Sequence, residues 1–153
     1  MVTRNSCKGR LRKLYTLEDK ILPMGLLYYQ EELFVANARV DQPSILVLQS
    51  SREGRIVSDA LLPSSSGICR VGNELFVSCS NHTAVTRNQM ALYCGQGNSS
   101  GNQDGVVSSA LLHSPNGLVN MGSSSIVCDT GNSSARVTSN GKVFKELSSV
   151  IYP

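Results

Sequence analysis

The stretch 107-VSSALLHSPNGLVNMGSSSIVCD-129 decides the fold, because the chain carries a second version of it. An ungapped comparison with 57-VSDALLPSSSGICRVGNELFVSC-79 matches Val, Ser, Ala, Leu, Leu, Ser and Gly at corresponding positions. A less similar copy, 23-PMGLLYYQEELFVAN-37, lies further upstream. Self-similarity at a period of about 45 residues is typical of proteins built from repeated supersecondary units.

Each copy predicts short strands. Nine residues after the glycine of each copy comes an apolar residue within a compact strand-like run: 33-LFVA-36, 75-LFVS-78 and 125-SIVC-128. Such runs, bounded by Gly, Asn and Ser, are typical of buried strands. A second marker, Gly-basic-aliphatic, recurs in 9-GRL-11, 54-GRI-56 and 141-GKV-143 and predicts a hairpin corner followed by a strand. No window keeps the apolar spacing of an amphipathic helix over three turns.

The repeats predict an all-β fold, a segment of a β-propeller with about three blades. The repeat units are approximately 13–48, 54–92 and 95–147, and each is long enough for one four-stranded sheet. Propellers close with four to eight blades, so we expect an open or incomplete arc. Exposed sheet edges invite association, and we therefore expect self-association or additional blades to close the ring.

The third repeat resembles the NHL family of six-bladed propellers. The residues that carry the resemblance are Asp104-Gly105, Ala110, Pro115-x-Gly117-Leu118, Val127-x-Asp129, Asn132, Arg136 and Gly141-x-Val143. The second repeat is a degenerate copy, with Ser65 and Cys79 where the third has Pro115 and Asp129. Ser133 stands where the family has the histidine of its name. The repeat signature Asp104, Gly105, Pro115, Gly117, Asp129 and Asn132 is interpreted as structural.

The resemblance implies a non-enzymatic interaction module that binds protein. A single-stranded RNA partner is the alternative, based on a basic start with Arg4, Lys8, Arg10, Arg12 and Lys13. RNA binding usually adds stacking aromatic residues to a basic stripe, and this chain has few aromatics. A net charge of +3 does not by itself indicate nucleic acid or a membrane surface.

Enzyme hypotheses come third. The tripeptide Asp129-Thr130-Gly131 matches the aspartic protease signature, whose chemistry needs two carboxylates that share a proton. No second such tripeptide exists, and the repeat places Asn37 and Cys79 at the position of Asp129. We therefore expect Asp129 to accept backbone N–H bonds in the turn after its strand, with Asn132 assisting. A peptide-amidating lyase, which the family also contains, would need histidine-bound metal.

Cofactors, metals and membrane spans are not predicted. His82 and His113 are scattered, and none of the five cysteines forms a C-x-x-C pair, so we expect free thiols. No run of about 18 apolar residues is present, and the N-terminus lacks the apolar stretch of a signal peptide, which favours the cytoplasm. The sequons at Asn81, Asn98 and Asn132 matter only in a secreted chain.

Overall fold

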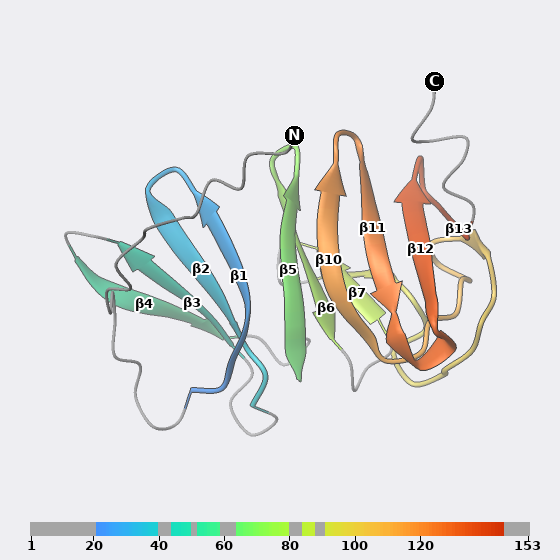
Figure 1. The fold of residues 1–153 in the computed structure, drawn as a ribbon, viewed down its shortest axis with the longest axis horizontal. Helices are drawn as coiled ribbons and strands as arrows, with labels where there is room; N and C mark the ends of the chain where they lie inside the picture. The colour runs from blue at the N-terminus through green and yellow to red at the C-terminus, as the bar shows by residue number, and fades with distance from the viewer. Residues whose placement is uncertain are drawn as a thin grey trace, which may run out of the picture.

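Three antiparallel sheets make up the described part of the protein. The computed structural model describes residues 21–39, 44–49, 52–58, 64–79, 84–87 and 91–145. Within these ranges the secondary structure is β, apart from a 3-10 turn at Thr130–Asn132 (η2). The sheets stand next to one another without closing into a ring (Figure 1). The predicted fold class, an all-β and open propeller segment, is confirmed.

Each sheet is a meander of four strands, to which the third adds a short fifth strand. The orders are β1-β2-β3-β4, β5-β6-β7-β8 and β10-β11-β12-β13-β9. The bounds are β1 Pro23–Tyr29, β2 Glu32–Asn37, β3 Ser44–Gln49, β4 Arg52–Ser58, β5 Ser65–Val71, β6 Glu74–Cys79, β7 Ala84–Arg87, β8 Ala91–Cys94, β9 Gly105–Val106, β10 Pro115–Met121, β11 Ser124–Asp129, β12 Ser134–Ser139 and β13 Lys142–Phe144.

The sequence copies correspond to the first two strands of each sheet. Residues Pro23, Ser65 and Pro115 open β1, β5 and β10, and they pair with Asn37, Cys79 and Asp129 at the ends of β2, β6 and β11. In all three hairpins the register shifts just after the opening residue, at the glycine of the repeat. Equivalent sequence positions therefore occupy equivalent structural positions, including the same bulge.

The Gly-basic-aliphatic marker lies at a hairpin corner in one described copy and inside a strand in the other. Gly141 has φ +71° and forms the corner between β12 and β13, together with Asn140 at φ +50°. Gly54 lies inside β4, so the prediction of a corner there is wrong. The copy at 9–11 lies outside the described residues. Because β4 belongs to the first sheet, that sheet extends into the predicted repeat 54–92, and the division into repeat units stays a prediction.

The innermost strands of the three sheets, β1, β5 and β10, lie side by side (Figure 1). We call the side of each sheet that faces later residues its forward face and the opposite side its back face. An added Cβ on Gly25, on the forward face of β1, would overlap the carbonyl oxygen of Ser66 in β5. One on Gly67 would overlap the carbonyl oxygen of Asn116 and lie 2.8 Å from the Leu118 nitrogen in β10. Glycine thus allows close approach between neighbouring sheets.

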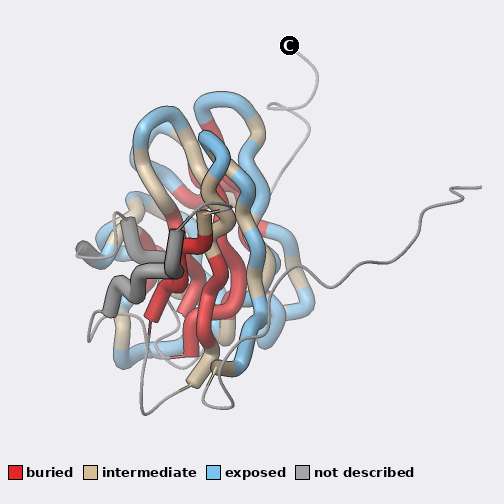
Figure 2. The backbone as a smooth tube through the Cα atoms, turned by 90° about the vertical axis from the view of Figure 1, so that its left-hand side faces the viewer, coloured by how far each residue is buried: buried red, intermediate tan, exposed pale blue. Residues whose placement is uncertain are grey.

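Apolar side chains pack between neighbouring sheets. The buried residues lie towards the middle of the molecule (Figure 2). Between the first and second sheets the buried cluster is Ala36, Ile45, Val47, Ile68, Val77 and Cys79. Between the second and third it is Cys69, Phe76, Cys94, Ala110, Leu112, Val127 and Val143, with Leu118 packed against it. Ile126 pairs with Val119 and Val137 and so lies on the forward face, outside this cluster. Alternation along β11 therefore turns Ile126 away from Val127.

The described cysteines are free thiols: Cys69, Cys79 and Cys94 are buried and Cys128 is exposed. Cys7 lies outside the described residues. Among the residues that the structure describes, there is no helix of the length and hydropathy needed to cross a membrane.

Candidate functional site

The Asp-Thr-Gly stretch forms two hydrogen bonds with the backbone of His113. The Asp129 carboxylate accepts the His113 N–H at 2.6 Å through Oδ1, and the Gly131 N–H donates to the His113 carbonyl at 2.8 Å. A Cβ on Gly131 would lie 2.7 Å from that carbonyl oxygen, so the close approach requires glycine. The N–H that Asp129 accepts therefore precedes β10 and does not belong to the turn after its own strand.

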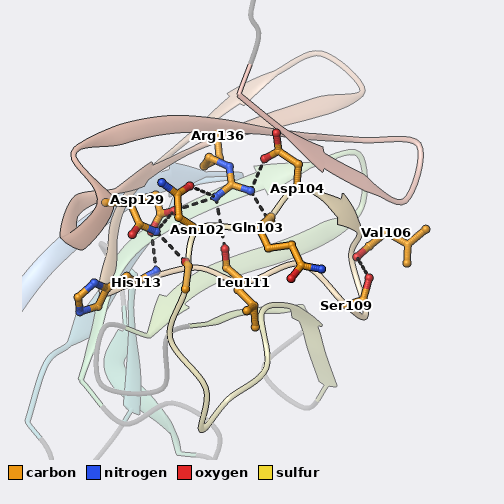
Figure 3. A network of polar contacts seen from close by, with 11 residues as sticks. Asn102, Gln103, Asp104, Val106, Ser109, Leu111, His113, Asp129 and Arg136 are labelled. Atoms are coloured by element: carbon orange, nitrogen blue, oxygen red, sulfur yellow. Dashed lines mark hydrogen bonds and ion pairs between the residues drawn. The ribbon is translucent and has the colours of Figure 1, made fainter.

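Arg136 joins the Asp129 carboxylate to the loop that precedes β10 (Figure 3). Its side chain is fully buried, and one guanidinium nitrogen donates to Asp129 Oδ2 at 3.0 Å. The other nitrogen donates to the Gln103 carbonyl at 2.9 Å and pairs with the Asp104 carboxylate, which is 45% exposed. A further bond reaches the Leu111 carbonyl at 3.3 Å. Charge-assisted bonds of this kind are stronger than neutral ones, so Arg136 holds the loop against the third sheet.

Asn132 completes this network. Its amide nitrogen donates to Asp129 Oδ2 at 2.7 Å and to the Gly101 carbonyl at 2.8 Å. A glycan on that nitrogen would displace these bonds, whereas Asn98 is exposed in the loop after β8. In a glycosylating host we expect mass spectrometry to find glycan on Asn98 and none on Asn132. Asn81 lies outside the described residues.

The first sheet carries a neutral version of the same arrangement. Asn37, which corresponds to Asp129, accepts the Leu22 N–H at 3.0 Å and donates to the Ser44 hydroxyl at 2.9 Å. Leu46 occupies the place of Arg136, because it pairs with Val35 as Arg136 pairs with Val127. The shared function of the Asn37 and Asp129 position is therefore to fix the backbone that enters the first strand. The charge is an addition of the third sheet.

The chemistry of the network is that of a support for the loop. Asp129 has no exposed surface, and both its oxygens already accept hydrogen bonds. Across the described ranges, no group of three or more His, Cys, Asp or Glu residues is arranged to hold a metal ion. His113 is exposed, and His82 falls outside the described residues. The remaining signature residues lie around the network: Gly105 in β9 has φ +147°, Pro115 is buried at the start of β10, and Gly117 lies in its bulge.

A buried thiol lies within the field of the network. Burial raises the pKa of the Cys94 thiol from 9.0 to about 12; nearby Arg136 lowers this pKa, while Asp129 raises it. Burial also raises the pKa of Cys69 to about 11. Thiols with such high pKa values stay protonated and are poor nucleophiles near neutral pH, so both serve as packing groups.

The loop that Arg136 fixes forms one wall of a pocket at the outer junction of the second and third sheets. The pocket has a volume of about 550 Å³ and is lined by Leu92, Tyr93, Gly95, Gln96, Val107, Ser108 and Gly141. Its walls are held by two bonds: Gln96 donates to the Ser108 carbonyl at 2.6 Å, and the Val107 N–H donates to the Gly141 carbonyl at 2.9 Å. Leu92, which is 49% exposed, adds apolar surface at this junction.

Sequence reasoning missed two features of this region. It recognised Arg136 only as part of the repeat pattern, although the residue pairs with Asp104, 32 positions away, and with Asp129. The presence of acidic Asp104 and basic Arg136 in the same repeat is a sequence signal that could have indicated this ion pair. The pocket had no sequence signal, because its lining comes from the end of the second sheet and from the loops of the third.

Comparison with known proteins shows a fold relationship alone. No family model matches the chain, and no curated protein matches its sequence. A crystal structure of an auxiliary nutrient binding protein from Bacteroides thetaiotaomicron is similar, with a TM-score of 0.58 at 18% identity. The match covers 74% of this chain and 32% of that one, so this chain spans about a third of the structure it resembles. The structural neighbour is a binding protein.

Proposed function

We propose that this chain is an NHL-type propeller segment that acts as a non-enzymatic binding module for protein. The observation that carries the proposal is the pocket at the junction of the second and third sheets. Its volume lies within the range of about 300–1,000 Å³ that is typical of ligand sites, and its wall is fixed by the buried Arg136. A rigid scaffold that presents loops and a shaped pocket is the usual basis of recognition by such folds.

The ligand that fits is an extended peptide with an apolar side chain. β8 is the outermost strand of the second sheet, and an added peptide strand can pair with such an edge. Leu92 of β8 is 49% exposed and also lines the pocket, so a peptide lying along β8 would bring its side chains to that opening. The structural relationship to a nutrient binding protein supports a binding role in general.

A selection from a displayed peptide library tests the proposal. Peptides enriched on the unmodified protein should bind the variant Leu92→Asp at least about tenfold more weakly, because burial of one leucine contributes roughly 1.5–3 kcal/mol. Leu22→Asp is the matched control, since Leu22 is 53% exposed but precedes the first sheet, and its binding should be unchanged.

Two results would count against a peptide ligand at this pocket. One is enrichment of no peptide, or of peptides that bind Leu92→Asp as well as the unmodified protein. The other is binding of an oligouridine probe whose affinity falls steeply with salt while no peptide is selected, which would favour the RNA alternative.

A further inference from the structure

The two outer faces of the arc carry apolar residues at positions that are buried between the described sheets. On the back face of β1, Leu26 is 66% exposed, whereas its equivalent in β5, Ile68, is 5% exposed against the first sheet. On the forward face of β10, Val119 is 54% exposed, whereas its equivalent Cys69 is 4% exposed against the third sheet. The repeat thus shows how each of these surfaces packs when it is covered.

The forward face of the third sheet also has the glycine that close sheet packing needs. Gly25 and Gly67 each lie against a carbonyl oxygen of the next sheet. At Gly117, among the described residues, the atoms within 4 Å of an added Cβ belong to Cys128 of the same sheet, with Sγ at 3.3 Å. Cys128 is exposed, although the equivalent Ser78 is fully buried and donates to the Asn116 carbonyl of the third sheet.

We propose that the forward face of β10 and β11 binds the back face of β1 in a second copy of this chain. The two surfaces are complementary in the same way as the first and second sheets, and the second and third sheets, of one copy. In each contact, one side has a glycine and an apolar residue, and the other side has a carbonyl and an apolar residue. Gly117 would receive the carbonyl of Met24 from the second copy, as Gly25 receives that of Ser66 and Gly67 that of Asn116. Val119 and Leu26 would extend the buried row.

The back face of β1 has the chemistry of an interaction surface. Met24 and Tyr28, which flank Leu26 on the back face, are 56% and 71% exposed, so the row is apolar over the length of β1. Isolated exposed apolar residues are common, but a continuous row marks an interaction surface. A head-to-tail contact made twice by two copies closes into a ring of six sheets, which lies within the four to eight blades of closed propellers.

The first test measures mass in solution over a range of concentrations. Unmodified protein should form a dimer by light scattering after size exclusion. Gly117→Ala should be monomeric, because its Cβ overlaps a carbonyl in the pair. Within one copy that Cβ needs only a small shift of the exposed Cys128 side chain, so at concentrations too low for the unmodified protein to dimerise both proteins should unfold at the same urea concentration. Val106→Asp is the control, since Val106 is exposed on β9, at the edge of the third sheet opposite β10, and it should remain dimeric.

A cross-link tests the register of the contact. Ser78 of the second sheet contacts Asn116 of the third. In the repeat, Cys128 corresponds to Ser78 and Met24 to Asn116, so Cys128 of one copy should contact Met24 of the other. In a background with Cys7→Ser, Met24→Cys should give a covalent dimer on mild oxidation that disappears with Cys128→Ser. Val106→Cys should give none. A monomer at every concentration, an open polymer, dimers that persist in Gly117→Ala, or cross-links that do not need Cys128 would each overturn the proposal.

Discussion

Breaking the ion pair of Asp129 and Arg136 by Asp129→Asn is the most informative perturbation of the fold. Asparagine preserves the shape and an oxygen that can accept the His113 N–H. It removes the negative charge from a side chain that, like that of Arg136, is 0% exposed. The other counter-charge of Arg136, Asp104, is 45% exposed and is screened by water. Removing one partner of a buried pair costs about 3–5 kcal/mol, because the other charge stays buried without compensation.

The first sheet shows how to design the second half of this experiment. There the equivalent residues are Asn37 and Leu46, a neutral pair. Arg136→Leu alone should cost a similar amount, about 3–5 kcal/mol, because it leaves the Asp129 charge buried. The double variant should cost less than the sum of the two single variants by about 2–3 kcal/mol, because no charge is left without a partner.

Urea unfolding followed by circular dichroism measures these free energies. Asp104→Asn is the control, and its cost should stay below about 1 kcal/mol because its side chain is 45% exposed and water screens the pair. The reasoning is wrong if Asp129→Asn costs less than Asp104→Asn, or if the effects of Asp129→Asn and Arg136→Leu simply add.

Three further predictions follow from the backbone and the thiols. Gly67→Ala should lower the free energy of unfolding by roughly 2–5 kcal/mol, whereas Gly117→Ala should have little effect within one copy. If urea unfolding gives the same cost for both variants, the sheet packing is contradicted. Replacing Gln30-Glu31, at φ +48° and +64°, by Asn-Gly should raise the melting temperature through a gain of about 1 kcal/mol, and a decrease would argue against that turn. Because the pKa of Cys94 is higher in the folded state than in the unfolded state, the folded state keeps the thiol proton to higher pH. The free energy of unfolding should therefore fall between pH 9 and about 12, by up to about 1.4 kcal/mol per pH unit. Urea midpoints measured over this pH range should fall less steeply with pH in Cys94→Ala.

Much of the fold could be predicted from sequence, because the information was local and repeated. The glycine of each copy and the apolar run nine residues later identify the first two strands of each sheet. A single copy would not have separated a buried strand from a buried helix segment, but three copies with the same spacing do. The side of the sheet on which Ile126 lies was not local information, because it depends on the register of β11 with β10 and β12.

The candidate site was less accessible to sequence reasoning. Asp129-Thr130-Gly131 has the letters of a catalytic motif, and the repeat indicated a structural role. Its actual partner, the backbone of His113, lies 16 positions earlier and could not be read from spacing. Likewise, the burial of Arg136 depends on a loop that folds back over the sheet from residues 101–113. Contacts at such separation are decided by tertiary packing.

β1, β5 and β10 pack side by side, with Gly25 and Gly67 each against the next sheet. Nuclear Overhauser effects from the Gly25 Hα protons to Ser66 and Ile68, and from the Gly67 Hα protons to Asn116 and Leu118, test this packing most directly. Both sets should appear, because an added Cβ on either glycine would overlap backbone atoms of the neighbouring strand. Absence of both sets, in a sample that still shows the cross-strand effects between Leu26 and Val35, would contradict the propeller arrangement.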